Sequence, residues 1–182
     1  MERYWNSKSD QYSRFFQTAK RSIRGSAVDV LVFEDSETKG LTGGDDSGTF
    51  KNCVNDENVS GKEHSDSLGN HGIGKNSVFS YSGVHTVFYS SLNTEGKHMF
   101  KGVSKLGNYK DGNGIKRSER IYYGDVEGES VKLLDDSERI PVLFKREEPG
   151  LSQYVIGAEV YYNWSEKVKK AFISNYWYLF IN

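Results

Sequence analysis

A glycine-rich segment, GNHGIGKNS at residues 69–77, contains residue types that bind phosphate groups. Gly69, Gly74 and Lys75 fit the P-loop pattern G-x-x-x-x-G-K-[ST], but Asn76 occupies the position of the hydroxyl that binds the metal ion. A P-loop also follows directly on a buried strand, whereas the preceding residues, GKEHSDSL, are polar. A P-loop phosphotransferase is therefore the weakest of three functional hypotheses.

A different phosphate cradle fits the same glycines. Gly69, Gly72 and Gly74 stand immediately before an expected helix. Glycine there lets backbone N–H groups approach an anion, and the helix N-terminus adds unpaired donors. Lys75 adds a mobile positive charge. Upstream, Asp35 follows a short β-branched segment, and its carboxylate can accept a hydrogen bond from an exocyclic amine such as that of adenine.

These residues need a scaffold, and the hydrophobic pattern predicts one. Apolar residues recur at helical spacing over 9–24, and AVDVLVF at 27–33 indicates a buried strand. Residues 36–70 are polar and rich in glycine, which predicts a lid-like loop without packed elements. A short helix is expected at 75–82. The remaining expected elements are strands at VHTVFYSS (84–91), HMFKGVSKL (98–106), RIYYGD (120–125), RIPVLFKR (139–146) and QYVIGAEV (153–160), and a closing helix that starts at Ser165.

The order of these elements predicts an α+β fold. We expect a two-layer α/β sandwich in which a mixed, mostly antiparallel sheet carries helices on one face. The 182 residues suffice for one core, so residues 1–182 are expected to form a single domain or part of one.

The net charge and the composition limit which binding partners the protein is expected to have. The net charge is −1, so no global electrostatic attraction to nucleic acid or anionic membranes is expected. Cys53 is the single cysteine, and the N-terminus has no apolar signal-peptide core. No apolar run reaches the roughly 20 residues that span a bilayer. The four histidines share no metal-ligand spacing. These features predict a cytoplasmic protein without a membrane partner.

Two segments resemble the Bergerat-fold, or GHKL, ATPases, the superfamily of gyrase B, the ninety-kilodalton heat-shock chaperone, histidine kinases and MutL. VFEDSETKGLTG (32–43) looks like the first nucleotide box of that superfamily, and GNHGIGKNSVF (69–79) looks like its glycine-rich second box. The similarity covers most of the chain. It is closest to a prokaryotic branch associated with DNA restriction and phage defence, which HTVFYSS (85–91), FKGVSKL (100–106) and IYYGD (121–125) also resemble.

The resemblance implies roles for individual residues. Asp35 would bind the adenine amine, and Gly40 and Gly43 would shape the turn beside the base. The glycines of the second box, Gly69, Gly72 and Gly74, would let the lid wrap the phosphates, and Lys75 would reach toward them. The implied cofactors are ATP and Mg²⁺. The implied function is a nucleotide-driven switch that acts on other domains or subunits, with indirect DNA association through restriction or phage defence.

Three positions depart from the family pattern. Glu37 stands where Gly or Asn is usual, and Lys39 stands where Thr is usual. Leu151 replaces the Thr expected after Gly150 in a late G-T motif. A carboxylate near phosphates is unfavourable, so Glu37 must point away from them or the site is weakened.

The superfamily's first motif, E-x-x-x-N, holds Mg²⁺ through its Asn and activates water through its Glu. Glu2 and Asn6 have this spacing, but the preceding helical turn is missing. Either these are the motif, or the chain is a fragment without it that binds nucleotide poorly and does not hydrolyse it. The second functional hypothesis is therefore a truncated or degenerate interaction module of the same fold, which the apolar segment NYWYLFIN (175–182) also favours.

Overall fold

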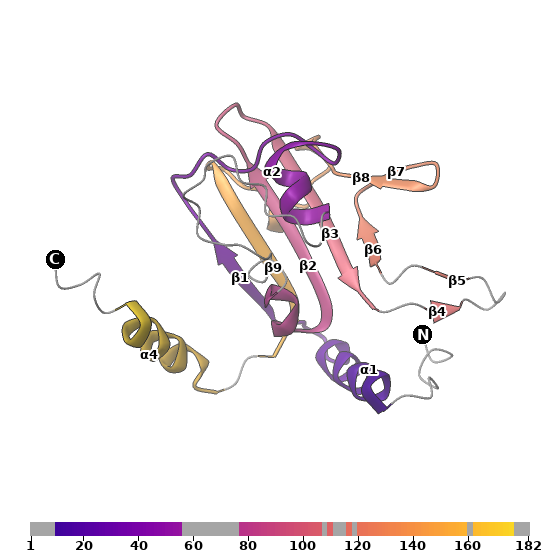
Figure 1. The fold of residues 1–182 in the computed structure, drawn as a ribbon, viewed down its shortest axis with the longest axis vertical. Coiled ribbons are helices and arrows are strands. Elements are labelled where there is room, and N and C mark those ends of the chain that lie inside the picture. Colours follow the sequence, from indigo (N-terminus) through magenta and orange to yellow (C-terminus); the bar gives the residue numbers. More distant parts are fainter. Residues whose placement is uncertain are drawn as a thin grey trace.

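A computed structural model describes residues 10–55, 77–106, 109–110, 116–117, 120–159 and 162–176. These residues form an α+β arrangement around a five-stranded antiparallel sheet (Figure 1), which confirms the predicted class. Every strand pair in the described part of the chain is antiparallel, so the parallel component of the predicted mixed sheet is not found there.

The sheet has the strand order β1-β9-β2-β3-β6. The central strands β9 and β2 hydrogen-bond on both sides, whereas β1 and β6 lie at the edges. Two separate two-stranded ribbons, β4–β5 and β7–β8, accompany it. The strands are β1 (Val30–Glu34), β2 (Ser82–Leu92), β3 (His98–Lys105), β4 (Tyr109–Lys110), β5 (Lys116–Arg117), β6 (Arg120–Tyr123), β7 (Asp125–Glu127), β8 (Ser130–Lys132) and β9 (Gly150–Ala158).

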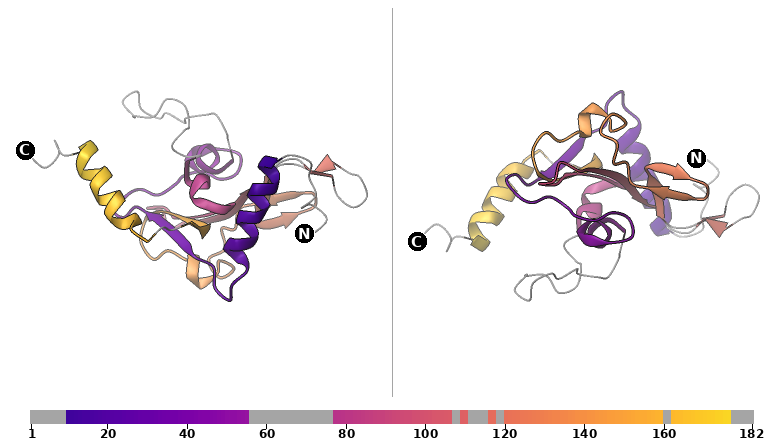
Figure 2. Two further views of the ribbon diagram at one scale, coloured as in Figure 1. Left: turned by 90° about the horizontal axis from the view of Figure 1, so that it is seen from below. Right: turned by 90° about the horizontal axis from the view of Figure 1, so that it is seen from above.

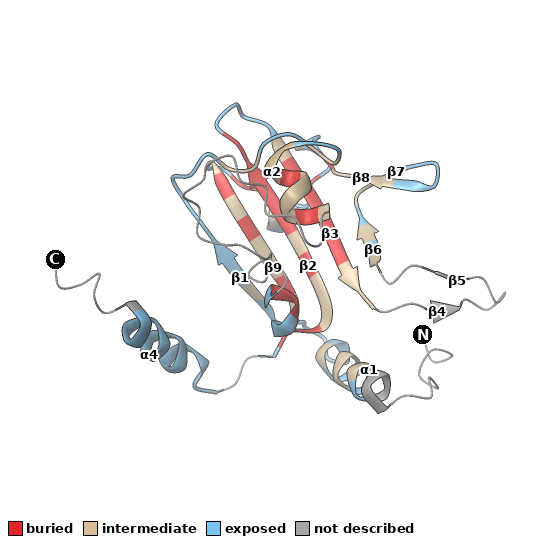
Figure 3. Cartoon of the chain, viewed as in Figure 1, coloured by how far each residue is buried: buried red, intermediate tan, exposed pale blue. Residues whose placement is uncertain are grey.

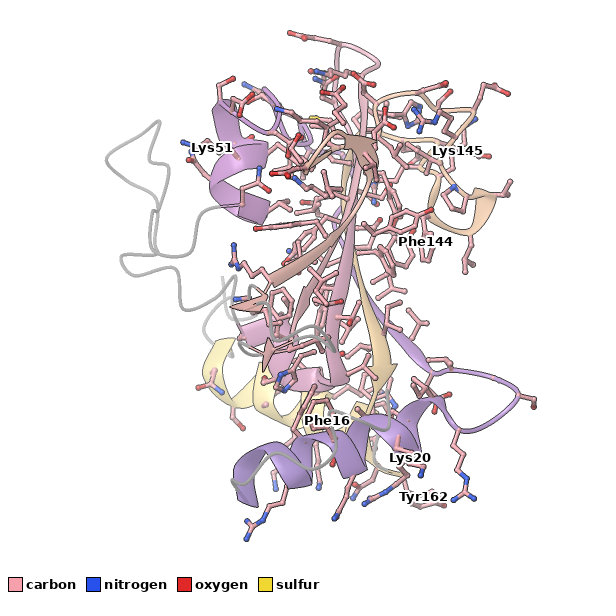
Figure 4. All side chains as sticks on the ribbon, turned by 90° about the vertical axis from the view of Figure 1, so that its right-hand side faces the viewer. Phe16, Lys20, Lys51, Phe144, Lys145 and Tyr162 are labelled. Carbon is pink, nitrogen blue, oxygen red and sulfur yellow. The ribbon has the colours of Figure 1, made fainter. Side chains whose placement is uncertain are left out.

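Helical elements lie around the sheet as Figure 2 shows. The elements α2 and η2 cover one face together with η3, and we call it the helix-covered face. The segment that contains η4 lies on the opposite face, and α1 lies at one end of the strands. In Figure 4 Lys51 marks the first side, and Phe144 and Lys145 mark the second. The helical elements are α1 (Asp10–Ile23), α2 (Gly48–Phe50), the π-helical turn η2 (Lys51–Asn55), the 3₁₀ turns η3 (Val78–Tyr81) and η4 (Val142–Phe144), and α4 (Trp164–Tyr176).

The main hydrophobic core lies between the helix-covered face and the helices. Side chains alternate along a strand, so Val87 and Tyr89 of β2 point to this face and Phe88 points to the other. Phe50 of α2 and Val54 of η2 pack onto the helix-covered face of the sheet. Figure 3 shows the buried residues concentrated in β2, β3, β9 and α2. The buried members of this cluster are Phe50, Val54, Val78, Phe79, Val87, Tyr89, Met99, Val103 and Val155.

A smaller aromatic core covers the opposite face. Phe88 and Phe100 stack with their ring centroids 5.7 Å apart, and Phe144 of η4 stacks on both at 5.3 Å. Gly102 leaves room for this stack, because a Cβ there would lie 2.3 Å from the Phe88 ring. The aromatic cluster therefore fixes the segment that leads from η4 into β9.

Two predictions about secondary structure need correction. Residues 48–55 were expected in a loop without packed elements, but they form α2 and η2 and bury Phe50 and Val54. Two apolar residues four positions apart suffice to anchor a helical turn on the sheet. The segment 139–146 is not a strand, because Pro141 precedes the 3₁₀ turn η4. Within η4, Phe144 packs inward, while Val142 and Leu143 are 90% and 73% exposed. The other expected strands and both long helices are confirmed, within a few residues at their ends. The expected burial of the first strand is wrong: β1 lies at the edge of the sheet, and four of its five residues are exposed.

Candidate functional site

Asp35 follows β1 at its C-terminal end and is exposed. Its backbone N–H donates to the Leu151 carbonyl at 3.0 Å. Its carboxylate Oδ1 accepts hydrogen bonds from the Leu151 N–H at 2.6 Å and from the Thr38 hydroxyl at 3.1 Å. Oδ2 accepts no hydrogen bond from the described residues. One carboxylate oxygen is thus fixed by the protein, and the other can accept a hydrogen bond from a ligand.

Gly150 allows this close approach of β9 to Asp35. Its φ is 149°, and a Cβ at this position would lie 2.6 Å from Asp35 Oδ1 and 2.4 Å from an Arg146 nitrogen. Only glycine fits here without displacing its neighbours. Gly150 and Leu151, where the resemblance implies a G-T motif, therefore lie beside Asp35. Leu151 donates its backbone N–H to Asp35 Oδ1, and its side chain has no hydroxyl.

Arg146 holds the backbone on the other side of Asp35. It is 6% exposed. Its Nη2 donates to the Asp35 carbonyl at 2.8 Å, and its Nη1 donates to Glu34 Oε1 at 2.7 Å and to the Ser152 hydroxyl. Its Nε donates to the Glu148 carbonyl at 3.1 Å. No sequence pattern identified this role, because Arg146 is one of three basic residues in the segment 139–146 and its partners Glu34 and Asp35 lie 112 and 111 residues away.

Gly40 and Gly43 shape the turn that follows Asp35, and the resemblance implies this role for both residues. Their φ angles are 65° and 82°, which glycine adopts without a Cβ clash. A Cβ on Gly40 would lie 2.2 Å from the Leu92 carbonyl oxygen, and one on Gly43 would lie 2.2 Å from the Ser47 carbonyl oxygen. Their position beside a purine base stays a prediction.

Ser91 ties this turn to the start of β9. Its buried hydroxyl accepts a hydrogen bond from the Leu41 N–H at 2.8 Å and donates to the Gly150 carbonyl at 2.9 Å. The segment after Asp35 and the strand beside it are therefore held together through one side chain. No sequence pattern identified Ser91, because its partners lie 50 and 59 residues away.

Glu37 has a left-handed backbone, with φ at 59°, and its side chain is exposed. The left-handed region is easily reached by Gly, and Asn also adopts it, but it costs other residues about 1–2 kcal/mol. Gly or Asn, the residue types that the resemblance implies here, would adopt this backbone conformation more readily than Glu.

We predict that Glu37→Gly stabilises the protein by about 0.5–1 kcal/mol, because it relieves the left-handed strain but adds backbone entropy to the unfolded chain. Urea denaturation of the variant and the parent measures the change. Glu95→Gly is the matched control, since Glu95 is also exposed but lacks a positive φ. A lower midpoint for Glu37→Gly than for the parent would contradict the role of strain.

A buried polar cluster fixes the elements that follow the turn. Lys101 Nζ lies 2.5 Å from Asp45 Oδ1, and their side chains are only 4% and 10% exposed. Asn55 Nδ2 donates to Asp45 Oδ1 at 2.9 Å, and the Leu133 N–H donates to Asp45 Oδ2 at 2.6 Å. Arg120 donates to the Asn55 carbonyl at 2.7 Å. The cluster joins Asp45, which precedes α2, and Asn55 of η2 to β3 and β6, and no sequence pattern predicted it.

The same cluster controls the ionisation of Asp45. Burial by itself would raise the pKa of this carboxyl, but hydrogen bonds from Asn55, Lys101 and the Leu133 N–H, together with the positive charge of Lys101, lower its pKa below the ordinary 3.8. Asp45 is therefore a charged partner of Lys101 at neutral pH.

Residues 69–76 of the segment that resembles the second nucleotide box lie outside the described residues. This applies to Gly69, Gly72, Gly74 and Lys75, and also to Glu2 and Asn6. The expected meeting of these glycines with Asp35 around one ligand stays a prediction. The described residues contain no group of three or more His, Cys, Asp or Glu side chains that could hold a metal ion, so Mg²⁺ binding also stays a prediction.

Comparisons with known proteins add no relative. No family model, curated protein or solved structure matches the chain. None of the described helices has both the length and the apolar character that a membrane crossing requires.

Proposed function

We propose that the chain is an ATP-binding domain of the GHKL type, which acts as a nucleotide-driven switch. One observation carries this proposal. Asp35 stands at the end of β1 with Oδ1 fixed by the Leu151 N–H and the Thr38 hydroxyl, while Oδ2 accepts no hydrogen bond from the described residues. Such an oxygen is suited to the exocyclic amine of adenine. It disfavours guanine, which carries a carbonyl acceptor at that position.

The surroundings of Asp35 support a preorganised site. Buried Arg146 fixes its carbonyl, Gly150 lets β9 approach it, and Ser91 ties the following turn to β9. A binding group held by rigid partners loses little entropy when a ligand binds. The five-stranded antiparallel sheet with α2, η2 and η3 on one face is compatible with a two-layer α/β sandwich, and its identity as a Bergerat fold is part of the proposal.

The remaining roles follow from the resemblance. Gly69, Gly72 and Gly74 would contact the phosphates through backbone N–H groups, with Lys75 and Mg²⁺ balancing their charge. Hydrolysis requires an E-x-x-x-N motif, so this chain by itself is expected to bind ATP without turning it over unless Glu2 and Asn6 supply that motif. A role in DNA restriction or phage defence, exerted through attached domains or subunits, rests on analogy with the branch that the sequence resembles.

A second candidate function is a non-catalytic interaction module of the same fold. Two observations favour it. Leu151 offers no side-chain hydroxyl beside Asp35, and α4 exposes apolar side chains, with Val168 56%, Phe172 49% and Ile173 59% exposed. A module of this kind would hold its partner without a nucleotide.

Nucleotide-dependent thermal stability distinguishes the two candidates. With Mg²⁺ and ATP at about 100 times the dissociation constant, binding stabilises the folded state by about 2.7 kcal/mol. For a chain of this size, that corresponds to a rise in Tm of roughly 5–10 °C. We expect ATP to produce this rise and GTP to produce much less. An unchanged Tm with ATP over the accessible concentration range would favour the interaction module.

A further inference from the structure

We propose that Phe33 and Tyr81 form an aromatic platform that stacks on the nucleotide base and selects a purine over a pyrimidine. The inference rests on the proposed nucleotide-binding function and adds a second determinant of specificity to it. Asp35 distinguishes a base with an exocyclic amine from one with a carbonyl, but cytosine carries an amine as adenine does. A carboxylate alone therefore accepts a hydrogen bond from either base, and ring size has to be recognised by another group.

Phe33 and Asp35 lie on the same face of the sheet. Side chains two residues apart on a strand point the same way, and Leu31 of β1 packs against the main hydrophobic core, so Phe33 also points to the helix-covered face. The ladder continues past β1, because the Asp35 N–H donates to the Leu151 carbonyl. Leu151 packs against the same core, and opposed residues of two paired strands point to the same face. The Asp35 side chain therefore belongs to the helix-covered face.

The rings of Phe33 and Tyr81 contact each other on this face. Their centroids lie 5.8 Å apart, and the ring planes are tilted by 52°. Tyr81 belongs to η3, which is anchored in the main core through Phe79, a residue that is 8% exposed. Phe33 is 40% and Tyr81 is 50% exposed. The pair is thus held in place from below by the core and presents aromatic surface to the solvent.

The spacing between the platform and Asp35 suits a nucleotide base. A strand rises by about 3.3 Å per residue, so the Cα atoms of Phe33 and Asp35 are about 6.6 Å apart. A base whose amine donates to the Asp35 carboxylate can extend back along β1 over the Phe33 ring. Aromatic side chains stack on the π-faces of bases. A purine has two fused rings and makes more contacts with such a platform than the single ring of a pyrimidine, so the platform favours ATP over CTP.

Calorimetric titration of Mg²⁺–ATP and Mg²⁺–CTP tests the platform, with Phe33→Leu as the disruptive variant. Leucine keeps an apolar side chain but has no aromatic face. The parent should bind ATP more tightly than CTP. Phe33→Leu should weaken ATP binding at least about fivefold, the lower end of the loss expected when a ring that stacks on a base is removed. It should weaken CTP binding less, so that the preference for ATP decreases.

Ring-preserving and matched variants show whether the effect comes from stacking. Phe33→Tyr and Tyr81→Phe keep both rings and should keep the parent's preference for ATP, whereas Tyr81→Leu should reduce it as Phe33→Leu does. Tyr123→Leu is the matched control, because Tyr123 is 49% exposed but its ring contacts Phe88 on the opposite face. This variant should bind both nucleotides as the parent does.

A second measurement covers the case in which Phe33→Leu or Tyr81→Leu does not fold. In the parent protein, the nuclear magnetic resonance signals of the Phe33 and Tyr81 ring protons should shift upfield as ATP is added, because a stacked purine shields them. The signals of the Tyr123 ring should stay in place.

The outcomes separate this inference from the proposed function. A parent that binds ATP and CTP equally well, an ATP preference that folded Phe33→Leu retains, or ATP binding that leaves the Phe33 and Tyr81 signals unchanged would overturn the aromatic platform and leave ATP binding intact. A parent that binds neither nucleotide would overturn both.

Discussion

Replacing Asp45 with alanine should lower the free energy of unfolding by about 3–5 kcal/mol, the usual cost of leaving one member of a buried ion pair alone. Lys101 would remain in the core, 3% exposed, with its ammonium group against Asn55 Oδ1 and the Tyr122 ring. The Leu133 N–H would also lose its acceptor. Urea denaturation followed by circular dichroism measures the loss.

Asp46→Ala is the control, because Asp46 is 90% exposed and its pair with Lys132 is a surface contact expected to contribute no more than about 1 kcal/mol.

The acid limb of the stability curve gives an independent check on Asp45. Its folded-state pKa lies below the ordinary 3.8, so its contribution is fully present above that value and is lost as the pH falls through the folded-state pKa. Part of the parent's loss of stability in acid should therefore be missing in Asp45→Ala. Parallel acid limbs for the two proteins, or equal destabilisation by Asp45→Ala and Asp46→Ala, would contradict the role of the buried pair.

Phe100→Ala should cost about 3–5 kcal/mol, because it removes a fully buried ring and leaves a cavity. Phe100 contacts Phe88 and Phe144 in parallel stacks and Tyr123 edge-on at 5.9 Å. It lies under η4, so the substitution should also loosen the segment that carries Arg146 into β9.

Val142→Ala is the matched control for Phe100→Ala, because Val142 lies in η4 beside Phe144, the partner of Phe100, and is 90% exposed. It should change stability by less than about 0.5 kcal/mol. Thermal and urea denaturation of both variants measure the difference. If the two substitutions have similar effects, the aromatic stack is not what holds η4 on the sheet.

The sequence predicted the strands because their patterns are local and long. β2 and β3 are β-branched and aromatic runs with a turn signal between them, and both ends of that hairpin were placed within a few residues. Gly40 and Gly43 were named because the resemblance implies that they shape a turn, and the left-handed backbone of both suits glycine. Asp35 could be placed at a strand end because it follows a local β-branched segment.

The features that the sequence did not predict depend on residues far apart in the chain. Asp45 and Lys101 are separated by 56 residues, and Arg146 reaches Asp35 over 111. Residues 48–55 become helical because Phe50 and Val54 pack on the sheet. The polar residues around them give no hydrophobic pattern that predicts this packing. Pro141 turns an apolar segment that looks like a strand into a 3₁₀ turn.

The central claim is that the carboxylate of Asp35 binds the adenine amine of ATP, and calorimetric titration of Mg²⁺–ATP into the parent protein and Asp35→Asn tests it most directly. Asparagine keeps an oxygen for the Leu151 N–H and the Thr38 hydroxyl, but it presents an NH₂ donor where Oδ2 stood. The loss of a hydrogen bond to a charged group, about 1.5–3 kcal/mol, predicts affinity weakened roughly 10- to 100-fold. Asp46→Asn, on an exposed carboxylate elsewhere, should bind as the parent does. Equal binding heats and affinities for the parent and Asp35→Asn would contradict the claim.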